Sequence, residues 1–270
     1  MLVPKKILII QLRRIGDVIL TLPVINALRK NFPDAKIDFL TERPQDQFVR
    51  LSPQLDETLV YDKRHPFVWI KNLRKRGYDC VLDFHSNGRT LVLTALSGAK
   101  WKVGFCGPLT RALAYNLRVE PKAGSYIVDK KLGMLGALGL NVERWNWDLK
   151  LPQESMDWAD QFLKEAGVAG PPFKLAGIAP CSRRETRRWL PERWVQVLAG
   201  IVKRSHSALF LWGPGEQVEI ENLRREYICR IVLACYAPVV ESCVEISYCL
   251  RCIISAYRWE NALIYYTVNC

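Results

Sequence analysis

Short apolar runs alternate with segments of helical periodicity along the first 105 residues, and this alternation limits the possible folds more than any other feature. The runs that predict strands are KKILIIQL (5–12), KIDFLTER (36–43), ETLVYD (57–62), YDCVLDFH (78–85) and KWKVGF (100–105). Helical patterns follow Asp17 and lie near residues 47–51, 67–76 and 90–96. Because parallel strands need a crossover that is usually a helix, we predict a doubly wound α/β domain.

A second unit of the same kind begins after a stretch rich in proline and glycine. A helix is expected over about 154–166, followed by a linker at 167–172. Beyond the linker, a strand at 173–180, a helix from Pro191 and a strand with its loop at 207–216 start another α/β domain. The expected domains are therefore a Rossmann-like domain over 1–165 and the start of a second over 172–225.

The last segment, residues 226–270, does not continue this pattern. After Gly215 the chain holds no further glycine, although it has 16 in all, and most of its 9 cysteines crowd into this segment. Cys249 and Cys252 form one C-x-x-C without a second pair at zinc-ribbon spacing, so we expect no metal site. A tail translated in a shifted reading frame fits this composition better, and it predicts that the second domain is incomplete.

The charge balance favours an anionic partner. The chain has 39 Lys and Arg against 27 Asp and Glu, a net charge of +12, which suits nucleic acid, a phosphorylated metabolite or an anionic lipid surface. The apolar run at residues 7–10 is too short for a signal peptide and is followed by no cleavage pattern, so it predicts a buried strand. No uncharged run reaches the roughly 18 residues that span a bilayer. We therefore predict a cytoplasmic protein that touches a membrane only peripherally.

The segment LRRIGDVILTLP (12–23) places Asp17 where the first predicted strand gives way to a helix. Open α/β sheets bind ligands beyond the carboxyl ends of their strands, so Asp17 is expected to face the crevice between the two domains. Gly16 permits close backbone approach, and the helix N-terminus favours an anion. The alternative is that Asp17 simply caps the helix.

Two further segments place polar groups at strand ends. In VLDFHSNGRT, Asp83 and His85 end a strand and Arg89 lies in the next turn, although Asp83 could cap a helix and His85 could be structural. In APCSRRETRRWLPERW, arginine forks suit a diphosphate, while arginines interleaved with tryptophans could also bind single-stranded nucleic acid. The loop in LFLWGPGE suits backbone contacts to a nucleotide.

Taken together, four segments resemble one protein family in their order and spacing. ILIIQLRRIGDVILTLPVINALRKNFPDAKIDFL, DFHSNGRT with LSGAKWKVGF, RRWLPERW and LWGPGE are similar to the lipopolysaccharide heptosyltransferases of glycosyltransferase family 9 over residues 5 to about 221. The resemblance implies a GT-B architecture of two Rossmann-like domains, the first for a lipid-linked sugar acceptor and the second for ADP-heptose. It also implies an inverting transfer of heptose to a lipopolysaccharide inner-core acceptor, with no cofactor and no metal.

The resemblance also assigns roles to individual residues. Asp17 matches the family's proposed general base, and Arg187 stands where the family usually has a lysine that meets the diphosphate charge. Arg13 and Arg14 suit an acceptor with phosphates and acidic sugars. The donor-side residues implied are Ser182, Arg187, Arg188, Gly213, Gly215 and Glu216, and the acceptor-side residues are Arg13, Arg14, Gly16, Asp83 and Arg89.

Besides Arg187, the sequence departs from the family at two more places. Ser86 replaces its usual glycine, and nothing from Glu221 onward matches its Asp-Ser-Gly segment and following histidine, which predicts impaired donor binding. Two alternatives to an active transferase are therefore a basic nucleic-acid-binding protein and a non-catalytic remnant. For the transferase we expect a monomer with no nucleic-acid partner. Its partners would be a nucleotide sugar and an anionic lipid-linked oligosaccharide, the lipid A core, at the inner face of the cytoplasmic membrane.

Overall fold

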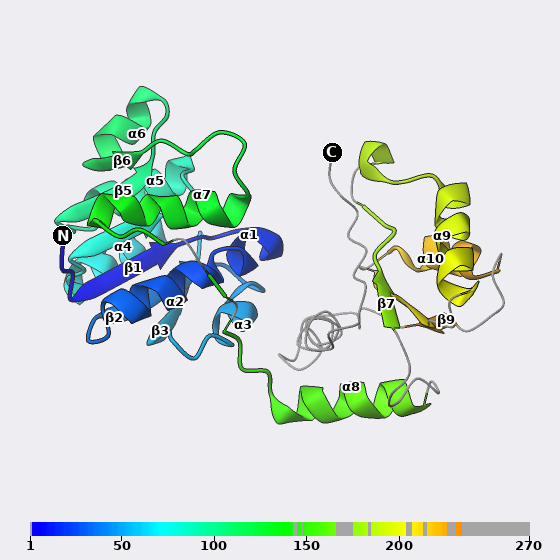
Figure 1. The fold of residues 1–270 in the computed structure, drawn as a ribbon. Coiled ribbons are helices and arrows are strands. Elements are labelled where there is room, and N and C mark those ends of the chain that lie inside the picture. Colours follow the sequence, from blue (N-terminus) through cyan, green and yellow to red (C-terminus); the bar gives the residue numbers. More distant parts are fainter. Residues whose placement is uncertain are drawn as a thin grey trace. The chain divides into compact units, whose positions relative to one another are not determined.

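Two compact units make up the protein, Met1–Lys150 and Leu151–Cys270. The computed structural model describes residues 2–142, 145–146, 148–165, 175–182, 185–203, 207–212, 215–225 and 231–233 (Figure 1). The units divide ahead of helix α8 (Gln153–Glu165), which the sequence analysis placed at the end of the first domain. The predicted linker at 167–172 lies outside the described residues.

A six-stranded parallel sheet forms the centre of unit 1. Its strand order, β3-β2-β1-β4-β5-β6, is that of a Rossmann fold. The five predicted strands are confirmed, and β6 is an addition that its three-residue length hid from pattern analysis. The strands are β1 (Lys6–Ile10), β2 (Lys36–Thr41), β3 (Glu57–Val60), β4 (Cys80–Asp83), β5 (Trp101–Phe105) and β6 (Leu117–Val119).

The helices of unit 1 begin and end at recognisable signals. Helix α2 has a proline in its first turn, α4 ends at Gly77 with φ 64°, and α5 begins with a capping box between Asn87 and Thr90. The single helix expected after Asp17 is divided into α1 and α2 at Leu20 and Thr21. The helices are α1 (Ile15–Ile19), α2 (Leu22–Asn31), α3 (Asp46–Val49), α4 (Pro66–Arg76), α5 (Gly88–Leu96), α6 (Leu109–Ala114), α7 (Ile127–Gly133) and the 3-10 helix η1 (Met134–Leu138).

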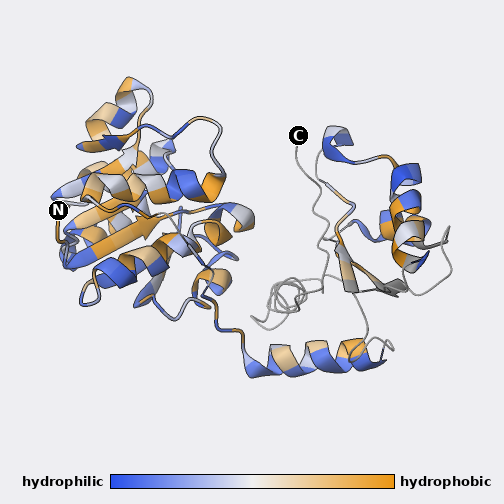
Figure 2. Ribbon diagram, in the orientation of Figure 1, coloured by the Kyte–Doolittle hydropathy of each residue, from blue (hydrophilic) through white to orange (hydrophobic). Residues whose placement is uncertain are grey.

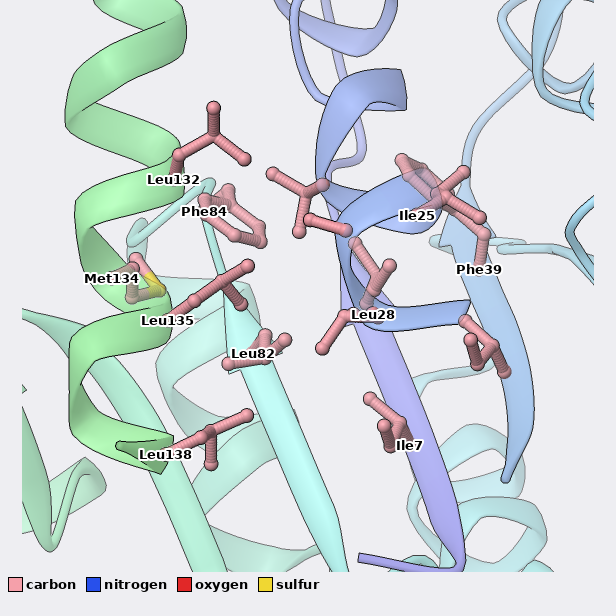
Figure 3. Close-up of a cluster of buried hydrophobic side chains, with 14 of the residues drawn as sticks. Ile7, Ile25, Leu28, Phe39, Leu82, Phe84, Leu132, Met134, Leu135 and Leu138 are labelled. Carbon is pink, nitrogen blue, oxygen red and sulfur yellow. The ribbon is translucent and has the colours of Figure 1, made fainter. Parts of the chain in front are cut away.

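Both faces of this sheet are buried, which explains why its strands are continuous apolar runs. In β1, Ile7 and Ile9 join the cluster under α2, α7 and η1, whereas Leu8 and Ile10 join the cluster under α4 and α5. Figure 3 shows Leu135 and Leu138 of η1 facing the same space as Leu28 of α2. In Figure 2, which is coloured by hydropathy, the strands are mainly apolar and the outer sides of the helices are mainly polar.

The apolar run near the N-terminus is β1, the central strand, as the sequence predicted. Hydrogen-bonded neighbours flank it on both sides, with β2 and β4 each running parallel to it. Of the helices that the structure describes, none combines the length and the apolar character needed to cross a membrane.

Unit 2 contains a smaller parallel sheet in the order β7-β8-β9. Its apolar cluster includes Trp194, Leu198, Phe210 and Ile220, all nearly or fully buried. The elements are α8, β7 (Leu175–Ile178), the 3-10 helix η2 (Glu185–Arg187), α9 (Pro191–Lys203), β8 (Ser207–Phe210), α10 (Gln217–Arg225) and β9 (Ile231–Leu233).

The α/β alternation extends further than the sequence analysis expected. The α/β pattern was not expected to continue in residues 226–270, yet residues 231–233 form β9, which pairs in parallel with β8. A strand of three residues is too short to show a period of two, so pattern analysis missed it. The remainder of the predicted tail, residues 234–270, lies outside the described part of the chain.

Candidate functional site

Asp17 lies in the helix that follows the central strand of unit 1. It is the third residue of α1 and is half-buried, and the N-cap position belongs to Arg14, so the capping alternative is wrong. Arg14 itself adopts φ 66°, a left-handed conformation that is strained for a residue with a side chain and that clusters at functional sites. In the part of the chain that the structure describes, no hydrogen bond or ion pair engages the Asp17 carboxylate. The Asp17 carboxylate therefore has no partner among the described residues.

Glu42 joins two of the predicted acceptor-side arginines. It follows β2, and its carboxylate lies 3.2 Å from Arg13 Nε and 2.8 Å from Arg89 Nη1. The Arg89 guanidinium also lies 6.0 Å from the centre of the Tyr61 ring. Glu42 was not among the predicted site residues, although its position at the end of a predicted strand was an available signal. The strand ends of β1, β2 and β4 thus bring Arg13, Glu42 and Arg89 together.

Asp83 ends β4 and is completely buried. Its carboxylate accepts hydrogen bonds from the main-chain N–H groups of His85 and Ser86, at 3.0 and 2.9 Å, and from the Tyr115 hydroxyl at 2.7 Å. Burial raises the pKa of the Asp83 carboxyl, against the opposing effect of these hydrogen bonds. Asp83 therefore holds the turn after β4 and has no exposed atom for an acceptor. It does not cap α5 either, because the N-cap is Asn87.

The turn after β4 presents His85 next to Gln11. The Gln11 Nε2 lies 3.1 Å from His85 Nδ1, and it also donates to the Arg13 carbonyl at 3.2 Å. Burial is the main effect that lowers the pKa of His85. The charges of Glu42 and Asp17 oppose it, and the charges of Arg89 and Arg13 act in the same direction as burial. The lowered pKa favours the uncharged form of the His85 ring at neutral pH.

A buried lysine lies beneath this cluster. Lys131 of α7 is 4 % exposed, and its Nζ donates to the Asp17 carbonyl at 2.7 Å, to Thr21 Oγ1 at 2.6 Å and to Gln11 Oε1 at 3.3 Å. Burial lowers the pKa of Lys131 to about 8, although the charge of Asp17 acts in the opposite direction. No sequence signal pointed to Lys131, because α7 was not predicted and Lys131 lies far from Asp17 in the chain.

The predicted donor-side residues lie beyond the strands of unit 2. Because β7 and β8 are adjacent and parallel, the loops that follow them lie at the same edge of the sheet. Arg187 is exposed in η2, and the described residues offer its guanidinium no ion-pair partner. Arg188 instead donates to the Ser182 carbonyl at 2.8 Å and pairs with Glu219 at 3.0 Å. Of these two arginines, Arg187 is the one available to a ligand.

The loop after β8 is described only in part. Gly215 has φ 84°, a conformation that favours glycine, and Glu216 follows it. Gly213 lies outside the described residues, as do Arg183 and Arg184. In unit 1, a Cβ at Gly16 would meet open space, so the backbone beside Asp17 is open to close approach.

Parallel α/β sheets in both units, with charged groups at their carboxyl ends, define a GT-B-like α/β protein. The family model of glycosyltransferase family 9 (heptosyltransferase) matches residues 67–235. The chain belongs to glycosyltransferase family 9. This match continues past residue 221, the limit of the resemblance seen in the sequence, and it includes α10 and β9.

Individual relatives agree with this assignment. The lipopolysaccharide core heptosyltransferase OpsX of Haemophilus influenzae is 23% identical over 230 residues, which are 82% of this chain and 64% of the relative. The chain thus spans less than two thirds of that relative. A family 9 glycosyltransferase of Veillonella parvula has a TM-score of 0.74 at 22% identity, over 86% of this chain and 69% of its own. The Escherichia coli ADP-heptose lipopolysaccharide heptosyltransferase II has a TM-score of 0.68 at 13% identity, over 90% and 76%.

Proposed function

We propose that this protein transfers a heptose from ADP-heptose to a lipopolysaccharide inner-core acceptor, with inversion at the anomeric carbon. Family membership supports the reaction class, and the names of the relatives supply the donor and the acceptor. The acceptor binds at the strand ends of unit 1, and the donor binds at the strand ends of unit 2.

Asp17 carries this proposal. Its carboxylate is half-buried and forms no hydrogen bond or ion pair with the described residues, and its charge acts to raise the pKa of His85. Asp17 accepts the proton of an acceptor hydroxyl while that oxygen attacks the anomeric carbon. The bond from the anomeric carbon to the diphosphate breaks, and ADP departs with the bonding electrons.

Arg187 supports the donor half of the reaction. The leaving diphosphate gains negative charge, and a guanidinium near it stabilises that charge in the transition state. Arg187 is exposed beyond β7 and makes no ion pair with the described residues, whereas Arg188 is engaged by Glu219. Arg187 therefore binds the diphosphate, whereas Arg188 holds the loop after β7 through Ser182 and Glu219.

The test is the Asp17→Asn variant, assayed with ADP-heptose and heptose-deficient lipopolysaccharide. Loss of one general base typically lowers the rate by about 10²–10⁴-fold. The matched control is Asp34→Asn, because Asp34 is an exposed aspartate in the turn before β2. The proposal predicts that only the Asp17 variant loses kcat and that both variants keep affinity for ADP. Unchanged turnover in the Asp17 variant would remove this residue from the mechanism.

An acceptor embedded in a membrane requires the protein to approach an anionic lipid surface. Helix α6 exposes Leu109 and Leu113 almost completely, at 86 % and 87 %, and it packs on α5, which exposes Val92 and Leu96. Arg111 lies between the two leucines in the chain, and the protein carries a net charge of +12. Exposed apolar residues on a protein of net positive charge suit the interface of an anionic bilayer. We assign this face to peripheral membrane contact by a single copy of the chain.

Vesicle flotation tests this assignment. The wild-type protein should float with vesicles that contain anionic lipid, and less with zwitterionic vesicles or at high salt. The double variant Leu109→Glu/Leu113→Glu should remain in the aqueous fraction. Val218→Glu, which changes an exposed valine of unit 2, should float like the wild type. Equal flotation of all three proteins would contradict the role of α6. Light scattering measures the mass of the protein in solution and so tests whether it is a monomer.

A further inference from the structure

The hydrogen bonds of the buried Lys131 determine how the neighbouring Gln11 and His85 side chains are oriented. An ammonium group can only donate, so the Gln11 oxygen must face Lys131. The Gln11 amide nitrogen then faces His85, and this nitrogen is also only a donor. His85 Nδ1 must therefore accept. In an uncharged histidine the single ring proton consequently lies on Nε2.

The same ammonium holds the segment that carries the proposed general base. Helix α1 has only five residues, and Lys131 Nζ donates a hydrogen bond to the carbonyl of its third residue, Asp17. A cation near the C-terminal end of a helix is favourable. Thr21 accepts from Lys131 at 2.6 Å and donates to the same carbonyl at 2.7 Å. These three groups form a closed set of hydrogen bonds under α1.

The position of Lys131 is held by packing. Its neighbour Leu132 lies close to Phe84 in the core (Figure 3), and the Lys131 ammonium lies 5.7 Å from the centre of the Phe84 ring. No described residue forms an ion pair with Lys131, so a buried cation is retained here without a salt bridge. Burying a cation in this way is unfavourable for stability, which favours a functional reason for its presence.

We propose that Lys131 is a positioning residue of the acceptor site, holding the Asp17 main chain and, through Gln11, fixing His85 as a hydrogen-bond donor from Nε2. This inference rests on the proposed function for the identity of the acceptor. The His85 Nε2–H binds an oxygen of the sugar acceptor. Lys131 itself remains buried and touches no substrate.

Nuclear magnetic resonance of the full chain, labelled with ¹⁵N-histidine, tests the proton position directly. The chain has 3 histidines, and His85→Gln identifies the His85 signals. The wild type should show one neutral tautomer at His85, with Nδ1 unprotonated and Nε2 protonated. Gln11→Glu keeps an oxygen for Lys131 but places a second oxygen toward His85, so it should move the proton to Nδ1. An unchanged tautomer in Gln11→Glu would overturn the inference.

Kinetics test the positioning of Asp17. Lys131→Met removes all three donors, and small displacements of reacting groups lower rates by up to about 10²-fold, so kcat should fall by about 10–100-fold while KM for ADP-heptose stays unchanged. Lys131→Gln retains a donor without the charge and should recover part of the loss. The control Lys130→Met changes the preceding lysine of α7 and should behave as the wild type.

The outcomes separate this inference from the proposed function. A wild type that transfers no heptose would contradict the function, while the His85 tautomer would still decide the Lys131 arrangement. A Lys131→Met protein with the wild-type tautomer and normal kcat would overturn the inference. Far-ultraviolet circular dichroism of each variant confirms that it is folded, and Gln11→Glu supplies the tautomer readout should Lys131→Met fail to fold.

Discussion

The Tyr115 hydroxyl donates a 2.7 Å hydrogen bond to the completely buried carboxylate of Asp83. Tyr115 lies between α6 and the edge strand β6, so this bond joins that segment to the turn after β4 that carries His85. The same hydroxyl lies 3.1 Å from Ser86 Oγ, and Ser86 has the left-handed φ of 51°. The shape of the candidate acceptor site therefore depends on a contact outside the site.

Tyr115→Phe should destabilise unit 1, because it leaves a buried carboxylate with one hydrogen bond fewer. The expected loss in the free energy of unfolding is about 1–3 kcal/mol. Urea unfolding at pH 7 measures it. Tyr126→Phe is the control, since Tyr126 is exposed, and it should unfold like the wild type.

The effect of Tyr115→Phe should also depend on pH. Burial raises the pKa of Asp83 above 3.8, and the Tyr115 bond opposes that rise. A raised folded-state pKa means that stability is lost as pH increases through it. Without Tyr115 the folded pKa is higher still, so the difference from the wild type should grow between acidic and neutral pH. A difference that is independent of pH would contradict ionisation of Asp83 in the folded protein.

Gly104→Ala should destabilise unit 1 by overpacking. A Cβ at Gly104 would overlap the ring of Tyr115. Overpacking in a core typically costs about 1–3 kcal/mol. Gly133→Ala is the control, because Gly133 has a helical conformation and open space around it. Thermal unfolding of both variants should show a loss for Gly104→Ala alone, and equal melting temperatures would exclude the contact with Tyr115.

The stability contributed at Lys131 should change with pH in a defined window. Its pKa is about 8 in the folded protein and 10.5 when unperturbed, so between these values the unfolded chain binds more protons. Stability should therefore rise with pH across this window, by on the order of 3 kcal/mol in total. Lys131→Met lacks this contribution. Unfolding of both proteins from pH 7 to 10 tests it, and a constant difference would contradict a depressed pKa.

Cysteine labelling should distinguish the environments of the described thiols. Cys80 is buried in β4, and burial raises its pKa to about 12, whereas Cys106 is half-buried. Burial, with the nearby charges of Glu216 and Glu219, also raises the pKa of Cys181 to about 12. Iodoacetamide at pH 8 should therefore modify Cys106 well before the other two, as followed by peptide mass spectrometry. Denaturant should remove the differences, and rapid native labelling of Cys80 would contradict its burial.

The sequence by itself determined the architecture of unit 1 and the position of Asp17. Continuous apolar runs such as Ile7–Ile10 encode strands that are buried on both faces, and their alternation with helical patterns requires parallel pairing. Because all parallel strands end at one edge, a carboxylate after β1 had to lie near the residues that follow β4. Local patterns were sufficient for this. They failed for β6 and β9, which have only three residues each.

Only the tertiary structure decided how the site is held together. The bond from Lys131 to the Asp17 carbonyl joins residues that are 114 positions apart, and no local pattern encodes such a contact. Likewise, the sequence predicted Asp83 as a ligand-binding group, but Tyr115 and the turn after β4 bury its carboxylate. Glu42 belongs to the candidate site because its carboxylate pairs with Arg13 and Arg89. Burial and the choice of hydrogen-bond partners depend on which elements pack together, so they arise with the fold.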